Sequence, residues 1–189
     1  MSDDSEQWIL NLYRTSEIAG SLFFGRLARS MKPGPIQYDM TKHFSDEAMH
    51  AWYWTSCLQE IGAETMSIKE AYQEQYLAAV GLPANVMEVL ALTQVFEKRV
   101  IHQYQLHSHN PTVHPAVQRT LVMIMKDEKW HIKWIHDALK SLEPEYGADL
   151  IHATFTRYWE ADQTVYGKTI SEHAERVQYL VERAGGRVA

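Results

Sequence analysis

The sequence predicts an all-α protein in which four long helices form a bundle, with a long crossover and an additional C-terminal helix. Three observations favour this fold class. Apolar residues recur at three- and four-residue spacing over long stretches, whereas the alternation typical of strands is scarce. Proline and glycine, which end helices, cluster at only a few places, so the helices between them are expected to be long. One short acidic motif also occurs twice, so the chain divides into two similar halves.

The first two helices are expected over residues 4–30 and 38–61. Asp3 with Glu6 forms a capping box at the start of the first helix, and the stretch 32–35, with two prolines and a glycine, ends it. Gly62 suits the end of the second helix.

The remaining helices follow a crossover over residues 63–82, which is expected to carry one short helix. The third helix is expected to begin at 83–85 with a capping box of Asn85 and Glu88, and to end before Asn110. The fourth runs from 112–115 to about Ser141. A single C-terminal helix is then expected over about 144–184, with Pro144 at its start.

The composition indicates one domain over residues 1–189, with a four-helix core at about 4–142. The net charge of −6 and the lack of a basic run argue against nucleic acid as a partner. Cys57 is the single cysteine, so a reduced, cytoplasmic setting is expected. The acidic N-terminus does not resemble a signal peptide, and no window of about 20 apolar residues predicts a membrane span.

The motif Asp-Glu-x-x-His occurs at residues 46–50 and again at 127–131. Within each copy, Glu and His share one face of a helix, one turn apart, so both can bind the same metal ion. A lone glutamate precedes each copy, at separations of 30 and 31 residues. The candidate metal ligands are therefore Glu17, Glu47, His50, Glu97, Glu128 and His131.

The expected turns lie midway between these paired residues. The midpoint of Glu17 and Glu47 falls at residue 32, and the midpoint of Glu97 and Glu128 falls at 112–113. Because a helix rises about 1.5 Å per residue in both directions, paired residues reach the same height in an antiparallel hairpin. Two such hairpins packed together would bring all six side chains to one level.

Chance and ion pairing are weaker explanations of this pattern. With 16 Glu and 10 His, about one Glu-x-x-His is expected by chance, but two copies that both follow Asp are not. Four carboxylates in a core would be heavily penalised without cations. Carboxylate and imidazole ligands with open positions favour iron or manganese. Asp46 and Asp127 are expected to accept a hydrogen bond from the ligand His of the opposite motif, the alternative being that they are exposed helix acids.

These residues resemble the ligand pattern of the ferritin-like di-iron carboxylate superfamily over about 140 residues. The resemblance implies a ferritin-like four-helix bundle that holds two iron ions, with manganese or a mixed Mn/Fe pair left open. It also implies that Glu47 and Glu128 bridge the metals and that Glu17 and Glu97 bind at the ends. Thr93 and Gln94 stand where rubrerythrin-like peroxidases carry a further carboxylate, and Trp54 stands where a radical-forming tyrosine occurs in ribonucleotide reductase.

The preferred function is an oxidoreductase that activates O2 or peroxide and oxidises a small organic substrate, with electrons from a donor protein. The alternatives are a ferroxidase for iron storage or detoxification and a rubrerythrin-like peroxidase. The oligomeric state is left open, a homodimer included. Small side chains beside Glu17 suggest space for O2 or substrate, and aromatic residues suggest its walls, although plain core packing is the favoured explanation for them. These pocket candidates are Gly20, Ser21, Phe24, Trp54 and Tyr104.

The other histidines receive simpler interpretations. His107, His109 and His114 lie near the expected turn between the third and fourth helices and are expected to be solvated. His43 lies one turn before Glu47, and both packing and proximity to the metal site are compatible with that position.

Overall fold

The computed structural model describes residues 4–68, 72–173 and 175–176, and all regular structure within them is α-helical. The all-α prediction is confirmed for these residues. The helices in chain order are α1 (Asp4–Ser30), α2 (Pro35–Glu60), α3 (Tyr72–Val80), α4 (Val86–Ser108), α5 (Pro115–Ser141), α6 (Glu143–Tyr146) and α7 (Ala148–Glu172).

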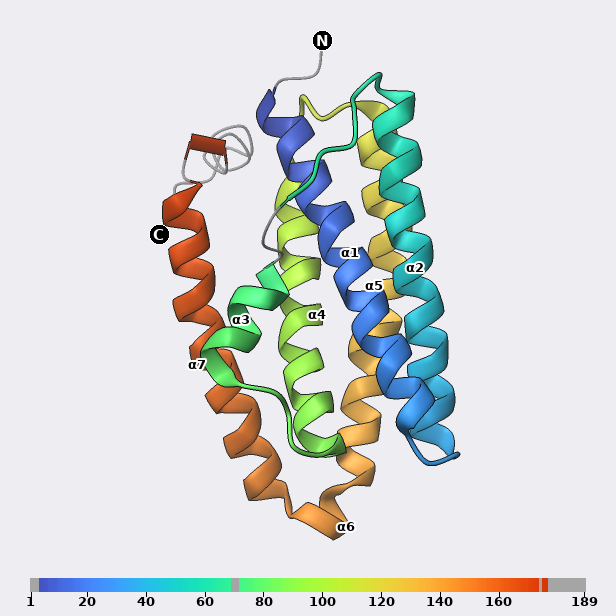
Figure 1. Cartoon of the computed structure of the whole chain (residues 1–189), viewed down its shortest axis with the longest axis vertical. Helices are drawn as coiled ribbons and strands as arrows, with labels where there is room; N and C mark the ends of the chain where they lie inside the picture. Colours follow the sequence, from blue (N-terminus) through green and yellow to red (C-terminus); the bar gives the residue numbers. More distant parts are fainter. Residues whose placement is uncertain (1–3, 69–71, 174, 177–189) are drawn as a thin grey trace.

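Four long helices lie side by side as two antiparallel pairs (Figure 1). The helix α1 packs against α2, α4 packs against α5, and contacts between α2 and α5 join the pairs. Figure 1 also shows that α2 and α4 run in the same direction, so the chain must travel back between them. The segment between α2 and α4 provides that return and carries the short helix α3, as predicted.

The turns of both pairs fall where the spacing predicts them. Residues 31–34 separate α1 from α2, and residues 109–114 separate α4 from α5. The helix α2 begins at Pro35 rather than at residue 38, because proline fits the first turn of a helix. Asn85 caps α4 by accepting from the Glu88 amide at 2.9 Å, whereas Glu88 accepts from the Ala84 amide. Asp3, the predicted cap of α1, lies outside the described residues.

The prediction of one continuous C-terminal helix over 144–184 is wrong. The helix α6 ends at Tyr146 and is followed by Gly147, whose φ of 81° lies in the left-handed region, and α7 begins at the next residue. An isolated glycine inside an otherwise helical pattern does not reveal this break, because glycine is also tolerated within helices. The predicted end at 184 lies outside the described residues.

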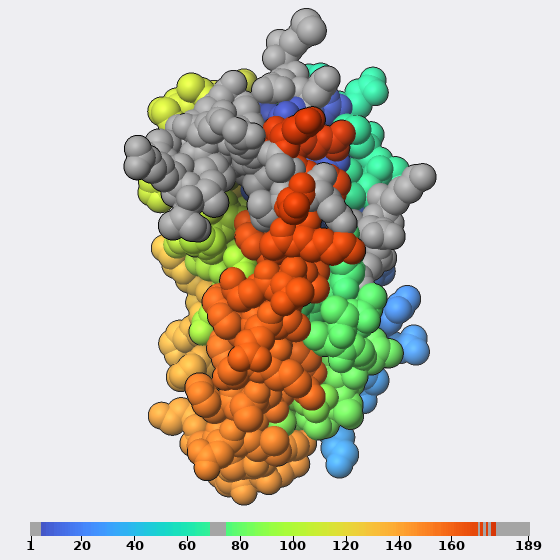
Figure 2. Space-filling view, turned by 90° about the vertical axis from the view of Figure 1, so that its left-hand side faces the viewer, coloured from blue at the N-terminus to red at the C-terminus, as the bar shows by residue number. Residues whose placement is uncertain are grey.

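The helix α7 covers the side of α4 that faces away from α5. Figure 2 shows α7 lying over this side of the molecule, with α3 beside it. Buried Arg99 of α4 donates from Nε to Asp162 Oδ2 of α7 at 3.1 Å, and its guanidinium lies 3.8 Å from the ring centre of Tyr166. Residues 89–97 of α4 are all buried, so the first half of this helix is covered on nearly all sides rather than along one stripe.

Two apolar clusters form the core, and a polar layer separates them. One cluster includes Trp54, Tyr104 and Ile124, and the other includes Phe24 and Ile135. Along each long helix, the candidate ligands fall between these clusters. No helix in the described part of the chain is both long and apolar enough to span a bilayer.

Candidate metal centre

The structure brings all six predicted ligands together in the polar layer between the two apolar clusters. They come from all four long helices, since α1 carries Glu17 and α4 carries Glu97, while α2 and α5 each carry one motif. All six are buried, with no residue more than 6% exposed. Burying so many ionisable groups is strongly unfavourable unless other charges offset them.

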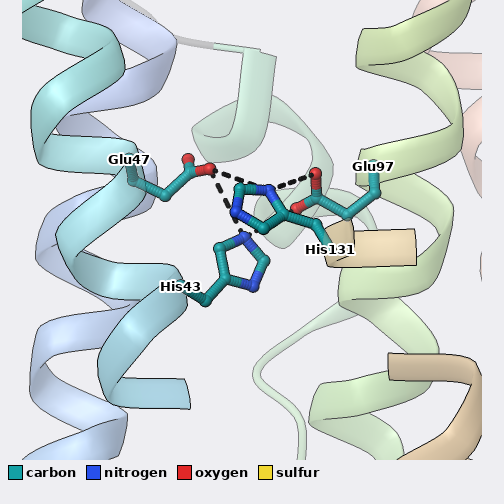
Figure 3. A group of neighbouring side chains, drawn as sticks. All are labelled: His43, Glu47, Glu97 and His131. Carbon is teal, nitrogen blue, oxygen red and sulfur yellow. Dashed lines mark ion pairs between the residues drawn. The ribbon is translucent and has the colours of Figure 1, made fainter. Parts of the chain in front are cut away.

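Two groups of four side chains could each hold a metal ion. The first group is Glu17, Glu47, His50 and Glu128, and the second is His43, Glu47, Glu97 and His131. In each group, one donor atom from every side chain lies within 4.8 Å of the others. Glu47 belongs to both groups, so its carboxylate lies between the two candidate positions. Figure 3 shows the second group, in which Glu47 and Glu97 approach the two imidazoles from opposite sides.

The two motif histidines direct Nδ1 toward the carboxylates. The Nδ1 atom of His50 lies 3.3 Å from Glu128 Oε1 and 3.7 Å from Glu17 Oε2. The Nδ1 atom of His131 lies 3.0 Å from Glu128 Oε2 and 3.5 Å from Glu97 Oε2. Glu128 therefore contacts both histidines, one through each oxygen.

The opposite ring nitrogens are held by the aspartates of the two motifs. His50 Nε2 lies 3.3 Å from Asp127 Oδ2, and His131 Nε2 lies 3.3 Å from Asp46 Oδ2. Both contacts cross from one motif to the other, as predicted. An ionised carboxylate can only accept a hydrogen bond, so Nε2 is the donor in each of these contacts. When the ring is neutral, Nδ1 then carries no proton, and its lone pair is available to bind a metal.

Burial and mutual repulsion change the protonation of the centre when no cation is bound. Burial, together with the charges of Glu17 and Glu97, raises the pKa of Glu47 well above its usual value. Burial acts to lower the pKa of His50, but its interactions with Glu128 and Glu17 outweigh this and raise it to about 12. The pKa of His131 is likewise raised, against the effect of burial, chiefly by the charge of Glu128. Protons on these groups can thus supply part of the positive charge that metal ions would otherwise bring.

The residues fit a pair of divalent ions. Among the described atoms, His50 Nδ1 and Glu128 Oε1 are buried and make no hydrogen bond, although they lie 3.3 Å apart. Buried polar atoms normally have a partner, so this pair is explained if a cation lies between them. Four carboxylates also match the charge of two divalent ions.

Three of the predicted pocket residues lie beside the centre. The Tyr104 hydroxyl donates to Glu17 Oε1, and Trp54 Nε1 donates to the Tyr104 hydroxyl at 3.2 Å. Tyr13 packs edge-on against Tyr104 with ring centres 4.8 Å apart. Phe24 packs against His43 at 4.2 Å. These contacts orient Glu17 and surround the centre with aromatic rings, while a role in binding O2 or substrate stays a prediction.

Gly20 of α1 borders a side chain of α2 rather than the predicted open space. The side of α1 next to Gly20 is filled by Glu47, because a Cβ added there would overlap Glu47 Oε2 and lie 3.5 Å from its Cδ. Ser21 donates to the Ile18 carbonyl at 2.9 Å within its own helix. Gly20 therefore makes room for the shared carboxylate.

Replacement of Gly20 by alanine is expected to weaken metal binding without destabilising the metal-free protein. Alanine favours the helix by about 0.5–1 kcal/mol, and the free Glu47 side chain can swing aside. A metal would hold that carboxylate in place, so affinity should fall about 10- to 100-fold. Titration with Mn(II) and thermal unfolding measure the two effects.

The matched control is Gly167→Ala in the interior of α7, where the added Cβ would meet no described atom within 4 Å beyond its chain neighbours and the nearby backbone of its own helix. This variant should gain helix stability and bind metal as the wild type does. Equal metal affinity in the Gly20 and Gly167 variants would contradict the role assigned to Gly20.

Two histidines outside the predicted ligand set are buried, and for His107 this differs from the prediction. His107 is fully buried rather than solvated, and burial lowers its pKa to about 4. It lies next to Tyr13, with ring centres 5.8 Å apart. His43 is also fully buried and lies within the second group of ligands. Its position one turn before Glu47 was the only sequence signal for that contact.

No family model, curated protein or solved structure matches this chain.

Proposed function

We propose that the four long helices form a ferritin-like bundle around two iron ions, and that the protein is an oxidoreductase. It would activate O2 or peroxide and oxidise a small organic substrate, with electrons from a donor protein. The observation that carries this proposal is the pair of buried four-residue groups that share Glu47. Manganese, or one manganese and one iron, would fit the same ligands.

The donor set favours redox-active metals over a structural zinc. Structural zinc sites are closed tetrahedra rich in cysteine and histidine, whereas this layer is dominated by carboxylates. The single cysteine, Cys57, lies within one apolar cluster and belongs to neither group. Iron ions bound here would supply the electrons that reduce O2 or peroxide and the oxidising power that acts on the substrate.

The protein side chains would orient the ligands and exclude water. Asp46 and Asp127 fix the ring orientation of the histidines from behind, and Tyr104 fixes Glu17. Asp46 also accepts from Lys42, so its charge is held in place from two sides. The apolar clusters above and below keep bulk water from the carboxylates, which strengthens their hold on a cation.

Two features favour an oxidase over the alternatives. The helix α7 is 25 residues long and packs against α4, whereas the resemblance implies a short fifth helix in storage proteins. Thr93 stands where rubrerythrin-like peroxidases carry a further carboxylate. Its hydroxyl donates to the Val89 carbonyl within the same helix, so this position offers no additional metal ligand. These features support turnover of an organic substrate rather than iron storage.

Anaerobic titration with Fe(II), followed by exposure to O2, tests the proposal. Two iron ions per chain should bind, and the loaded protein should consume O2 faster than free Fe(II) does. Fewer than one bound iron per chain would refute the metal centre. A large cage that accumulates iron would favour storage, and rapid oxidation by peroxide with slow oxidation by O2 would favour a peroxidase.

A further inference from the structure

His43 is the one member of the two ligand groups that is not among the six candidate ligands predicted from the sequence. It belongs to α2, one helical turn before Glu47, and its side chain is fully buried. Its Nε2 lies 3.3 Å from Glu47 Oε1 and 3.2 Å from Glu97 Oε1. One nitrogen therefore lies between two carboxylates that come from different helices, as Figure 3 shows.

The ring of His43 is also fixed relative to the motif histidine of the same group. It stacks on His131 with ring centres 3.7 Å apart and planes inclined by 22°. Phe24 packs on it at 4.2 Å, and Trp134 approaches edge-on at 5.7 Å. Aromatic contacts thus hold the imidazole in one place without using either of its nitrogens.

Hydrogen bonding does not explain this placement. Neither ring nitrogen of His43 makes a hydrogen bond to any described atom. The same is true of buried His107, so unpaired nitrogens alone do not identify a ligand. The difference is what surrounds them: Nε2 of His43 faces two carboxylates and lies in a group that could hold a metal, whereas His107 belongs to neither group.

We propose that His43 is a seventh metal ligand, which binds through Nε2 to the ion held by Glu47, Glu97 and His131. This inference rests on the proposed metal centre. The two positions then differ chemically, because the first group has three carboxylates and one imidazole, and the second has two of each. The repeat does not provide a counterpart, since Ile124 occupies the position one turn before Glu128.

The difference in ligands predicts a difference in metal preference. Imidazole suits cobalt, copper and zinc better than carboxylate does, whereas carboxylate-rich positions suit manganese. The second position should therefore bind Co(II) or Cu(II) first, and the two ions of a pair need not be the same element.

Metal titrations with His43→Gln test this proposal, with His107→Gln as the matched loss of a buried histidine. In the wild type, Co(II) should bind in two steps of unequal affinity. His43→Gln should weaken the tighter step at least about tenfold and bring the two steps together. His107→Gln should retain both steps.

A second measurement counts the imidazoles directly and also works on the wild type alone. With one equivalent of Cu(II), pulsed electron paramagnetic resonance should detect two coordinated imidazoles in the wild type and one in His43→Gln. Two bound metal ions with a single imidazole on the first would overturn the role of His43 and leave the metal centre standing. A wild-type protein that binds neither Co(II) nor Cu(II) would overturn both proposals.

Discussion

Replacement of Glu47 by glutamine is expected to abolish binding of the metal pair and to stabilise the metal-free protein. The side chain belongs to both ligand groups, so its loss affects both positions. In metal-free protein, burial and the charges of Glu17 and Glu97 disfavour its ionised form. The amide of glutamine mimics the protonated side chain and has no proton to lose on unfolding. At neutral pH the substitution therefore removes the cost of keeping Glu47 protonated, which is about 1.4 kcal/mol for each pH unit over which only the folded chain retains that proton.

Thermal unfolding and metal analysis of the same samples measure both effects. For a chain of this size, each 1 kcal/mol raises the midpoint of unfolding by about 2–4 °C. Glu160→Gln, at an exposed position of α7, is the matched control and should change neither quantity. A Glu47→Gln variant that unfolds at a lower temperature and still binds two ions would show that Glu47 has a structural role only.

Raising the pH is expected to destabilise the metal-free protein and to strengthen metal binding. His50 has a folded-state pKa of about 12, above the unfolded value of 6.5. Its contribution to stability is fully present below pH 6.5 and is lost as the pH rises toward 12. Glu47 and His131, whose pKa values are also raised, act in the same direction. The loss is about 1.4 kcal/mol per pH unit for each proton that only the folded chain retains.

His43 acts in the opposite direction, but only at lower pH. Burial and the neighbouring His131 hold the pKa of His43 well below 6.5, so it lowers stability where the unfolded chain is protonated, below about pH 6.5. The decline in stability of the metal-free protein should therefore be clearest between pH 6.5 and 8.5.

Metal binding must displace the protons on Glu47, His50 and His131. Affinity should rise about tenfold per pH unit for each proton released. Anaerobic thermal unfolding at pH 6.5, 7.5 and 8.5, with and without Mn(II), should show a stabilisation by metal that grows with pH. Calorimetry in buffers of different ionisation enthalpy counts the protons directly. Binding without proton release would contradict the protonation assigned to these side chains.

The sequence alone predicts the helical fold and the meeting of the six candidate ligands. Both depend on local regularities, since a helix has a fixed rise per residue and the turns lie midway between paired residues. The crossed contacts of Asp46 and Asp127 follow from the same symmetry, because two equivalent hairpins place each aspartate behind the opposite histidine.

Residues outside the repeat could not be assigned in this way. His43 and His107 are both isolated histidines on helices, yet one faces two carboxylates and the other faces Tyr13. The role of Gly20 depends on a side chain from another helix, Glu47, and the chain breaks its helical course at Gly147, between α6 and α7. Spacing along one helix determines which residues share a face of that helix. The contacts of that face are decided only by the packing of several helices, because the contacting side chains are distant in the sequence.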